Sequence, residues 1–266
     1  MMAPRVLAIV QARLGSTRLP GKALLPIAGR PMLAHVIGRT LAVPGVHHVV
    51  LATTVSPEDD GLEQVASSLG VSAVRGSVDD VLDRFHSVLR THPADAIVRV
   101  TADCPLLDPE VSGLVVADYV AHRDDVDYVS NVEPPTFPDG LDTEIVSAAA
   151  LDRAWREARL PSDREHVTPY IRTGKYGFRI RNVEYADANL AGHRWTVDEP
   201  RDLDFVRAIY DELAGDGGRM FGMHEVLALL RRRPELSTMN AGITRNEGLE
   251  RSRRLDRLAT PGGAHA

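Results

Sequence analysis

Residues 6–22 of the chain are Val6-Leu7-Ala8-Ile9-Val10 followed by Gln11-Ala12-Arg13-Leu14-Gly15-Ser16-Thr17-Arg18-Leu19-Pro20-Gly21-Lys22. The first five residues are all apolar, which predicts a strand buried on both faces of a parallel sheet. The next twelve hold two arginines, a lysine, two glycines and two hydroxyl side chains. A basic loop with glycines at the carboxyl end of such a strand is where an open α/β sheet holds a polyphosphate. The sequence therefore makes nucleotide chemistry the first hypothesis.

Composition limits the other function classes. The 266 residues are 44% hydrophobic and carry a formal net charge of −6, so no overall field attracts nucleic acid or an anionic membrane. The single cysteine excludes an intrachain disulfide framework and favours a reducing compartment. Apolar stretches stay well below the roughly 20 residues that span a bilayer, and the N-terminus becomes polar too soon for a signal peptide. We expect a cytoplasmic protein whose partners include neither nucleic acid nor a membrane.

Apolar periodicity alternates between strands and helices through the first half of the chain. Strand-like runs occupy 5–11, 47–53, 71–74 and 96–100. Helices are predicted at 31–42, 58–69 and 78–91, and Pro109 opens another at 109–122. Strands that alternate with helices of this length predict an α/β fold with a mostly parallel central sheet flanked by helices.

The pattern changes between residues 127 and 194, where we expect an insertion that supplies an acceptor pocket, a dimer surface or both. It contains a strand at 128–130, helices at 147–158 and 163–173, and an alternating strand at 177–184. Arg194 to Asp198 then predicts a strand end before helices at 200–214 and 222–232. Residues 237–266 are polar, which predicts a poorly ordered tail. We therefore predict a single domain over 1–236, with the insertion at about 127–194, and then a tail.

The loop at 11–22 does not fit the two best-known phosphate motifs. Its glycines are one residue too far apart for a P-loop, and Ala23 stands where that motif needs serine or threonine. It also lacks the glycine pattern of dinucleotide-binding folds. The simpler interpretation is a solvated basic loop whose glycines only make turns. Three cations at a strand end favour phosphate binding over that interpretation.

Two aspartates follow predicted strand ends. Asp103 follows the strand at 96–100, where a carboxylate can meet a metal ion held by a triphosphate, although a turn aspartate is the simpler alternative. Asp198 lies two residues before Pro200, which also suits a helix N-cap. The residues alone favour the metal interpretation for Asp103 and leave Asp198 open. Cys104 fits a small buried side chain better than a nucleophile.

Three further segments are charged. Ser77 and Asp80 resemble a capping box at the helix start, and the same loop can offer backbone groups and Arg84 to a nucleobase. The segments 137–144 and 163–170 of the insertion hold more charges than a connector requires. Within the second, His166 suits a ligand or a base, with an exposed or capping histidine as the default.

Six motifs occur here in the order in which a known family has them. They are Gln11 to Lys22, Arg75-Gly76 with Asp80 to Arg84, Thr101-x-Asp103-Cys104-Pro105-Leu106, Phe137-Pro138-x-Gly140-Leu141-Asp142, Arg164 to Thr168, and Asp198-Glu199-Pro200-x-Asp202-Leu203. In these motifs the sequence resembles the acylneuraminate cytidylyltransferase family, in the branch named for the spore-coat polysaccharide biosynthesis protein SpsF. Arg245 to Gly248 also looks like that branch's C-terminal segment, so the resemblance covers nearly residues 5–255.

The resemblance implies a nucleotidyltransferase of the fold shared with type A glycosyltransferases, which transfers CMP from CTP to a small acidic acceptor such as a sugar acid. It implies a homodimer, and Mg²⁺ held by Asp103 and Asp198. It assigns catalysis to Arg13, Lys22 and Asp103. The nucleotide-binding residues that it implies are Ala12, Arg13, Gly15, Ser16, Arg18, Lys22, Thr53, Arg75, Asp80, Arg84 and Thr101. The acceptor-binding residues are expected to be Asp139, Gly140, Glu144, Arg164 and His166.

The sequence leaves the acceptor and two rival functions open. Sialate-type members begin the loop with a proline and a glycine pair where this chain has Gln11 and Leu14, so sialic acid itself is not implied. A phosphonate would present an attacking oxygen as well as a sugar acid would. One rival is a glycosyltransferase of the same fold, which an Asp-x-Asp motif near residue 103 would favour. The other is a nucleotide-binding protein without catalysis.

Overall fold

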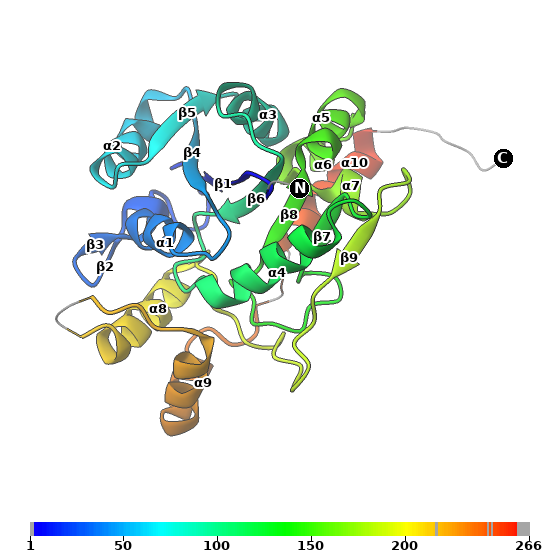
Figure 1. Cartoon of the computed structure of the whole chain (residues 1–266). Helices are drawn as coiled ribbons and strands as arrows, with labels where there is room; N and C mark the ends of the chain where they lie inside the picture. The colour runs from blue at the N-terminus through cyan, green and yellow to red at the C-terminus, as the bar shows by residue number, and fades with distance from the viewer. Residues whose placement is uncertain (1–2, 216–217, 244, 246, 260–266) are drawn as a thin grey trace.

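A seven-stranded sheet crosses the computed structural model, which describes residues 3–215, 218–243, 245 and 247–259 (Figure 1). The strand order is β5-β4-β1-β6-β8-β7-β9. The strands are β1 (Val6–Gln11), β4 (His48–Thr54), β5 (Ser72–Gly76), β6 (Ala96–Thr101), β7 (Tyr128–Ser130), β8 (Glu144–Ser147) and β9 (Ile180–Asn182). The first four in the order pair in parallel, β8 is antiparallel to both of its neighbours, and β7 and β9 are parallel. This confirms the predicted α/β fold with a mostly parallel sheet.

Strand β1 lies in the interior of the sheet, and apolar layers cover both of its faces. Val6, Ala8 and Val10 belong to the apolar cluster that also contains residues of α1 (Met32–Leu41), α2 (Asp60–Ser68) and α4 (Pro109–His122). Leu7 and Ile9 belong to the cluster on the other face, with residues of α3 (Val81–Thr91), α5 (Ala148–Glu157) and α7 (Pro169–Arg172). All five β1 side chains are at most 2% exposed, so their burial contributes strongly to folding.

A third apolar cluster lies at one end of the molecule, where Figure 1 shows α8 (Pro200–Leu213) beside α9 (Met223–Arg232). It also includes Trp195 and Val197, which precede α8. The shorter elements are η1 (Lys22–Leu24), β2 (Pro26–Ile27), β3 (Arg30–Pro31), η2 (Pro57–Asp59), α6 (Pro161–His166), η3 (Pro234–Thr238) and α10 (Glu247–Ala259). The third cluster holds the segment before α8 against the sheet's carboxyl edge, where Val197 N–H donates to Asp103 O.

The strand end predicted at 194–198 was wrong. The segment makes one isolated bridge between Arg194 and Asp139. Its amide groups bond to loops that lie beyond the strand ends: Trp195 N–H donates to Asp139 O at 2.7 Å, and Val197 N–H to Asp103 O at 2.8 Å. The helix predicted at 163–173 is two short helices, because Val167 adopts a φ of +71° between α6 and α7.

The prediction of a poorly ordered tail from residue 237 was also wrong for much of that segment. Helix α10 packs against α6, and Asp256 accepts a 3.1 Å hydrogen bond from the Ser162 amide. Its buried side chains include Leu249, Ser252 and Asp256. Because two of these three are polar, the segment lacks the apolar stripe by which helices are predicted. The predicted tail residues 260–266 lie outside the described residues.

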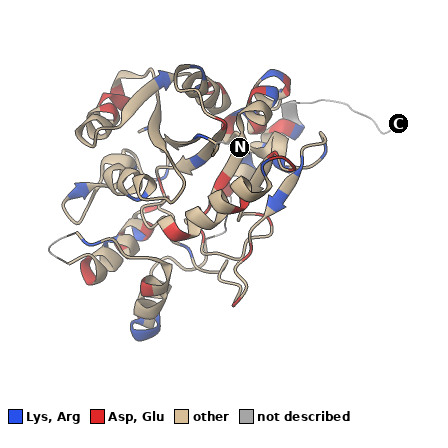
Figure 2. Ribbon diagram, viewed as in Figure 1, with Lys and Arg blue, Asp and Glu red and all other residues tan. Residues whose placement is uncertain are grey.

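Charge is distributed rather than concentrated. Figure 2 shows acidic and basic residues mixed across the elements, in keeping with the modest net charge of −6. In the described part of the chain, every helix falls short of the length and apolar character that crossing a bilayer requires.

Candidate active site

The ammonium group of Lys22 joins three segments that are far apart in the sequence. Its Nζ lies 3.1 Å from Asp103 Oδ2, 3.0 Å from Asp198 Oδ1 and 2.8 Å from the Val197 carbonyl oxygen. Lys22 ends the basic loop after β1, Asp103 follows β6, and Asp198 precedes α8. Because β1 and β6 are parallel neighbours, their carboxyl ends meet at one edge of the sheet. The fold thus brings together three residues that the sequence singled out separately.

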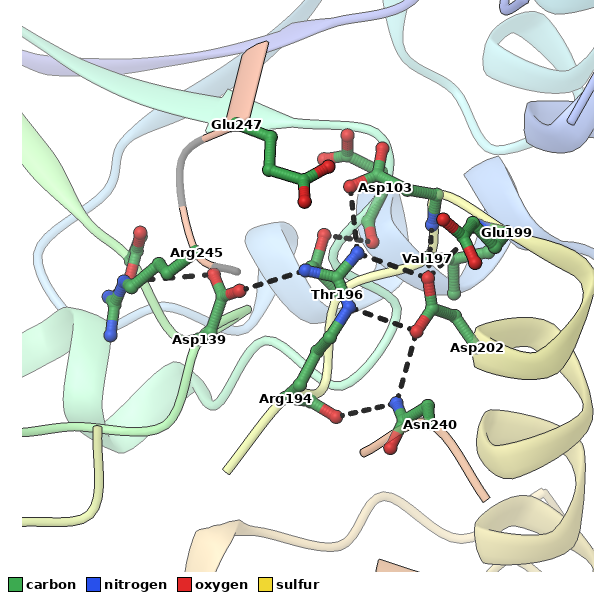
Figure 3. A network of polar contacts seen from close by, with 12 residues as sticks. Asp103, Asp139, Arg194, Thr196, Val197, Glu199, Asp202, Asn240, Arg245 and Glu247 are labelled. Atoms are coloured by element: carbon green, nitrogen blue, oxygen red, sulfur yellow. Dashed lines mark hydrogen bonds and ion pairs between the residues drawn. The ribbon is translucent and has the colours of Figure 1, made fainter. Parts of the chain in front are cut away.

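Asp198 is held by two more cations. Arg18 Nη2 lies 3.0 Å from its Oδ1 and Arg194 Nη2 lies 2.9 Å from its Oδ2. Figure 3 shows Arg194 between Asp139, at 3.3 Å, and the fully buried Asp202, at 3.0 Å. No local pattern in the sequence marks Arg194 as a site residue.

The N-cap of α8 is Glu199, which forms a capping box with Asp202. The capping role that the sequence left open for Asp198 therefore belongs to its neighbour. This leaves the Asp198 carboxylate directed at the cations of the site.

Charge pairing has a larger effect than burial on the pKa values of Asp103 and Lys22. Burial alone would raise the pKa of Asp103, but Lys22 and the Thr101 hydroxyl hold it at about 2. Burial would likewise lower the pKa of Lys22, and the two carboxylates instead hold it above its usual value. Both groups are therefore charged at neutral pH. By contrast, burial raises the pKa of the Cys104 thiol well above its usual value, in line with the inert side chain expected there.

The two carboxylates fit a magnesium ion that is shared with a substrate. In the described ranges, no three His, Cys, Asp or Glu side chains converge as a complete metal site. Magnesium needs no such cage, because it is commonly bound through one or two carboxylates together with substrate phosphates and water. Asp103 and Asp198 both pair with one ammonium nitrogen, so a single cation already bridges them.

Asp59 fixes the basic loop, a role that no local pattern signals. It is 1% exposed, accepts a 2.8 Å bond from the Leu14 amide, and bonds to the Thr54 hydroxyl. Within the loop, Ala12 N–H donates to Ala52 O, Ser16 Oγ accepts from Leu19 N–H, and Gly15 lies beside Glu58. The loop is therefore anchored at several points before any ligand binds.

Two arginines face each other at the start of α3. Arg13 and Arg84 donate to the same Val78 carbonyl, at 3.4 and 3.2 Å. Burial and the nearby Arg13 together lower the pKa of Arg84 to about 10. Two guanidinium groups this close favour an anion beside them. Arg13 thus lies toward α3 rather than among the partners of Lys22.

Nearby strand ends carry polar atoms without partners. Gln11 Oε1 on β1 and Thr53 Oγ1 on β4 are buried and have no hydrogen-bond partner among the described residues. Unpaired buried polar atoms are unusual in folded proteins and favour a ligand at the site. Thr101, on β6, lies in register with Gln11 and lines the cleft described below.

Three other predicted site residues are engaged in holding elements together. Arg75 donates to the carbonyls of Thr54, at 2.7 Å, and Ser56, at 2.6 Å. Asp80 caps α3 and pairs with Arg164 at 2.9 Å, so a predicted nucleotide residue and a predicted acceptor residue bind each other. These contacts link β5 to the loop after β4, and α3 to α6.

A cleft of about 220 Å³ opens beside Asp103 and Asp198. Of the predicted acceptor residues, Asp139, Glu144 and His166 line it. Lining residues that the sequence analysis missed include Arg99, Asp142, Thr168, Arg172, Arg194 and Glu247. Glu144 pairs with Arg99 at 2.6 Å and lies 3.9 Å from Arg172, and despite burial these arginines hold its pKa below the usual value.

The C-terminal segment forms one wall of this cleft. Arg245 pairs with Asp142 and donates to Phe137 O at 3.2 Å. Glu247 lies 3.4 Å from Arg18 of the basic loop, and Leu249 is buried. The sequence signal for this role was that residues 245–248 resemble a C-terminal motif of the family. The polar composition of the segment led instead to the prediction of a poorly ordered tail.

Gly140 packs closely against Trp195 and Thr196 and should not tolerate a side chain. Its φ is +106°, and a Cβ there would lie 2.7 Å from Trp195 C and 2.8 Å from Thr196 N. We expect Gly140→Ala to lower the free energy of unfolding by about 2–4 kcal/mol, measured by urea denaturation. Gly38→Ala, in α1 with no described atom within 4 Å of its Cβ, is the matched control and should raise stability slightly. Equal midpoints for the two variants would contradict the steric argument.

His166 should make stability fall in mild acid. Burial lowers its pKa to about 4, with Arg99 and Arg172 adding to the effect and Glu165 and Glu144 opposing it. Between pH 6.5 and 4 the unfolded chain takes up the proton first, so this group reduces the free energy of unfolding by up to about 3 kcal/mol below pH 4 and has no effect above pH 6.5.

Urea denaturation of the wild type and of His166→Gln from pH 7.5 to 4 measures this contribution. The difference between the two proteins should change only within that window. Parallel stability curves would show that His166 titrates normally.

An α/β sheet whose basic first loop meets one carboxylate after β6 and another before α8 through a lysine is typical of a nucleotide-dependent transferase. The sequence model of the family described as cytidylyltransferase matches residues 7–212. The chain belongs to the cytidylyltransferase family, which makes it a CTP-dependent nucleotidyltransferase rather than a glycosyltransferase.

Two of three similar proteins match over most of the chain, and the third matches over less than half of it. It is 32% identical over 239 residues to the spore coat polysaccharide biosynthesis protein SpsF of Bacillus subtilis, covering 88% of this chain and 97% of that protein. It is 36% identical over 120 residues to the 3-deoxy-manno-octulosonate cytidylyltransferase of Trichlorobacter lovleyi, covering 44% and 46%. The structure of a cytidylyltransferase from Leptospira borgpetersenii superposes with a TM-score of 0.84 at 29% identity, covering 90% of this chain and 99% of that one.

Proposed function

We propose that this protein transfers CMP from CTP to a small acidic acceptor, with a sugar acid as the first candidate, and releases pyrophosphate. The observation that carries the proposal is the meeting of Lys22, Asp103 and Asp198 beside the cleft. The similarity to SpsF and, over less than half of the chain, to a 3-deoxy-manno-octulosonate cytidylyltransferase supports it.

The reaction is an in-line displacement at the α-phosphorus of CTP. An acceptor oxygen forms the new bond to phosphorus, the bond to the bridging oxygen breaks, and pyrophosphate leaves. Lys22 and Arg18 offset the charge of the phosphates, and Arg13 with Arg84 binds the nucleotide at the start of α3. A magnesium ion held by Asp103 and Asp198 would neutralise further phosphate charge. Positioning supplies most of such catalysis, so no covalent intermediate is required.

The cleft suits an acceptor that carries both a carboxylate and hydroxyl groups. Arg99 and Arg172 each keep a buried Nε–H without a hydrogen-bond partner among the described residues, and these donors suit a carboxylate. Asp139 and Glu144 offer acceptors for sugar hydroxyls on the same lining. This pairing of donors and acceptors is what favours a sugar acid.

The remaining parts of the proposal concern the whole molecule. We place the protein in a reducing cytoplasm, which its single buried cysteine supports. A homodimer follows from the resemblance. A single domain over 1–236 is supported by the way β8, β7 and β9 extend the sheet begun by β1.

A pyrophosphate-release screen tests the proposal. The four nucleoside triphosphates are each incubated with magnesium and a panel of sugar acids and phosphonates. We expect release with CTP that depends on one class of acidic acceptor. Release with CTP that no acceptor on the panel increases would contradict the substrate class, and a preference for another triphosphate would contradict the nucleotide.

A further inference from the structure

Lysine is rare in this chain, and one of its two lysines lies in the site. Of the 31 lysines and arginines, only Lys22 and Lys175 are lysines. An ammonium group is compact and carries three rotatable donors, whereas a guanidinium is a planar fork. The three acceptors around Lys22 Nζ, at 2.8 to 3.1 Å, match these three donors.

The two carboxylates of the site already have a full set of cations. Asp103 is paired with Lys22, and Asp198 with Lys22, Arg18 and Arg194. Arg18 and Arg194 are shared with further carboxylates, whereas the side chain of Lys22 pairs with these two alone among the described residues. A divalent ion that approached both carboxylates would therefore meet the Lys22 ammonium between them.

The cations differ in how firmly they are held. Arg194 is bound by Asp139 and Asp202, and its backbone carbonyl accepts from Asn240, so it belongs to the rigid frame (Figure 3). Lys22 ends the phosphate-binding loop proposed above, and its side-chain nitrogen contacts only the two carboxylates and one carbonyl among the described residues. A triphosphate beside that loop would attract the ammonium more strongly than two carboxylates that share it.

We propose that Lys22 and the divalent ion are alternative partners of Asp103 and Asp198, so that the metal enters only together with a triphosphate that draws the ammonium away. This inference rests on the proposed function. Without a nucleotide, Lys22 is the shared partner of both carboxylates. When the nucleotide binds, the carboxylates exchange Lys22 for the metal. Lys22 is then a positioning residue for the metal in addition to its role toward the phosphates.

Metal binding to the full chain without nucleotide tests this directly. Mn²⁺ is titrated into the wild type, Lys22→Met and the matched control Lys175→Met, and free Mn²⁺ is followed by electron paramagnetic resonance. We expect Lys22→Met to bind one Mn²⁺ at least about tenfold more tightly than the other two proteins. Adding Asp103→Asn to Lys22→Met should remove the gained site, which places it at these carboxylates.

A second measurement needs no variant. The protein is labelled with ¹³C at lysine Cε, which gives one signal for Lys22 and one for Lys175. We expect CTP to shift the Lys22 signal, with Mg²⁺ alone leaving both signals unchanged.

Three outcomes would overturn the inference. The first is one tight Mn²⁺ site in the wild type without nucleotide. The second is no gain in Mn²⁺ affinity in Lys22→Met, and the third is a Lys22 signal that Mg²⁺ shifts without nucleotide. Failure of the proposed function is separate, because it would appear as no binding of CTP in calorimetry with magnesium.

Discussion

Replacing Asp103 with asparagine should lower the rate of CMP transfer by about a thousandfold or more while the protein stays folded. The amide keeps the shape of the side chain but removes the charge that pairs with Lys22 Nζ at 3.1 Å. Lys22 retains Asp198 and the Val197 carbonyl, so the local packing has little reason to change. We expect the loss mainly in kcat, because the charge is needed where phosphate charge moves.

Lys22→Ala should be as inactive, because it removes the cation that we place on the triphosphate. Pyrophosphate release with CTP and the acceptor found by the screen measures both variants, and circular dichroism checks their fold. Asp118→Asn is the control, since Asp118 pairs with the exposed Arg181 and neither residue lines the cleft, so the rate should stay unchanged. Full activity in either Asp103→Asn or Lys22→Ala would contradict the assignment of these residues to the active site.

Replacing Arg194 with methionine should lower the free energy of unfolding by about 3–5 kcal/mol. Arg194 is 9% exposed and contacts Asp139, Asp198 and the fully buried Asp202. Methionine fills much of the same volume but leaves a buried carboxylate without its cation, and an uncompensated buried charge is costly. The midpoint of urea denaturation measures the effect.

Two further variants separate the charge effect from packing. Arg181→Met breaks an exposed ion pair and should leave the midpoint unchanged, because surface pairs contribute little. Adding Asp202→Asn to Arg194→Met should recover part of the loss, since no charge then remains buried alone. A double variant as unstable as the single one would show that packing, not charge, is the cause.

Local sequence patterns were sufficient to predict most of the fold. The apolar runs of β1, β4 and β6 and the spacing of α1 and α3 follow from side chains that point alternately to two layers or to one helix face. Strand β8 and the β2–β3 hairpin were not predicted, because their short segments gain stability from pairing with strands elsewhere in the chain.

The sequence by itself determined the basic loop, the two candidate carboxylates and the family resemblance, because each is a contiguous motif at a strand or helix boundary. The tertiary structure alone decided how they are joined and what surrounds them. Arg194 meets Asp139 across 55 positions, Arg245 meets Asp142 across 103, and Arg18 meets Glu247 across 229. Ion pairs between segments this distant leave no periodic signal, because only the folded chain brings their charges within reach. For the same reason the segment from residue 245, polar in composition, becomes a wall of the cleft only once its charges find partners there.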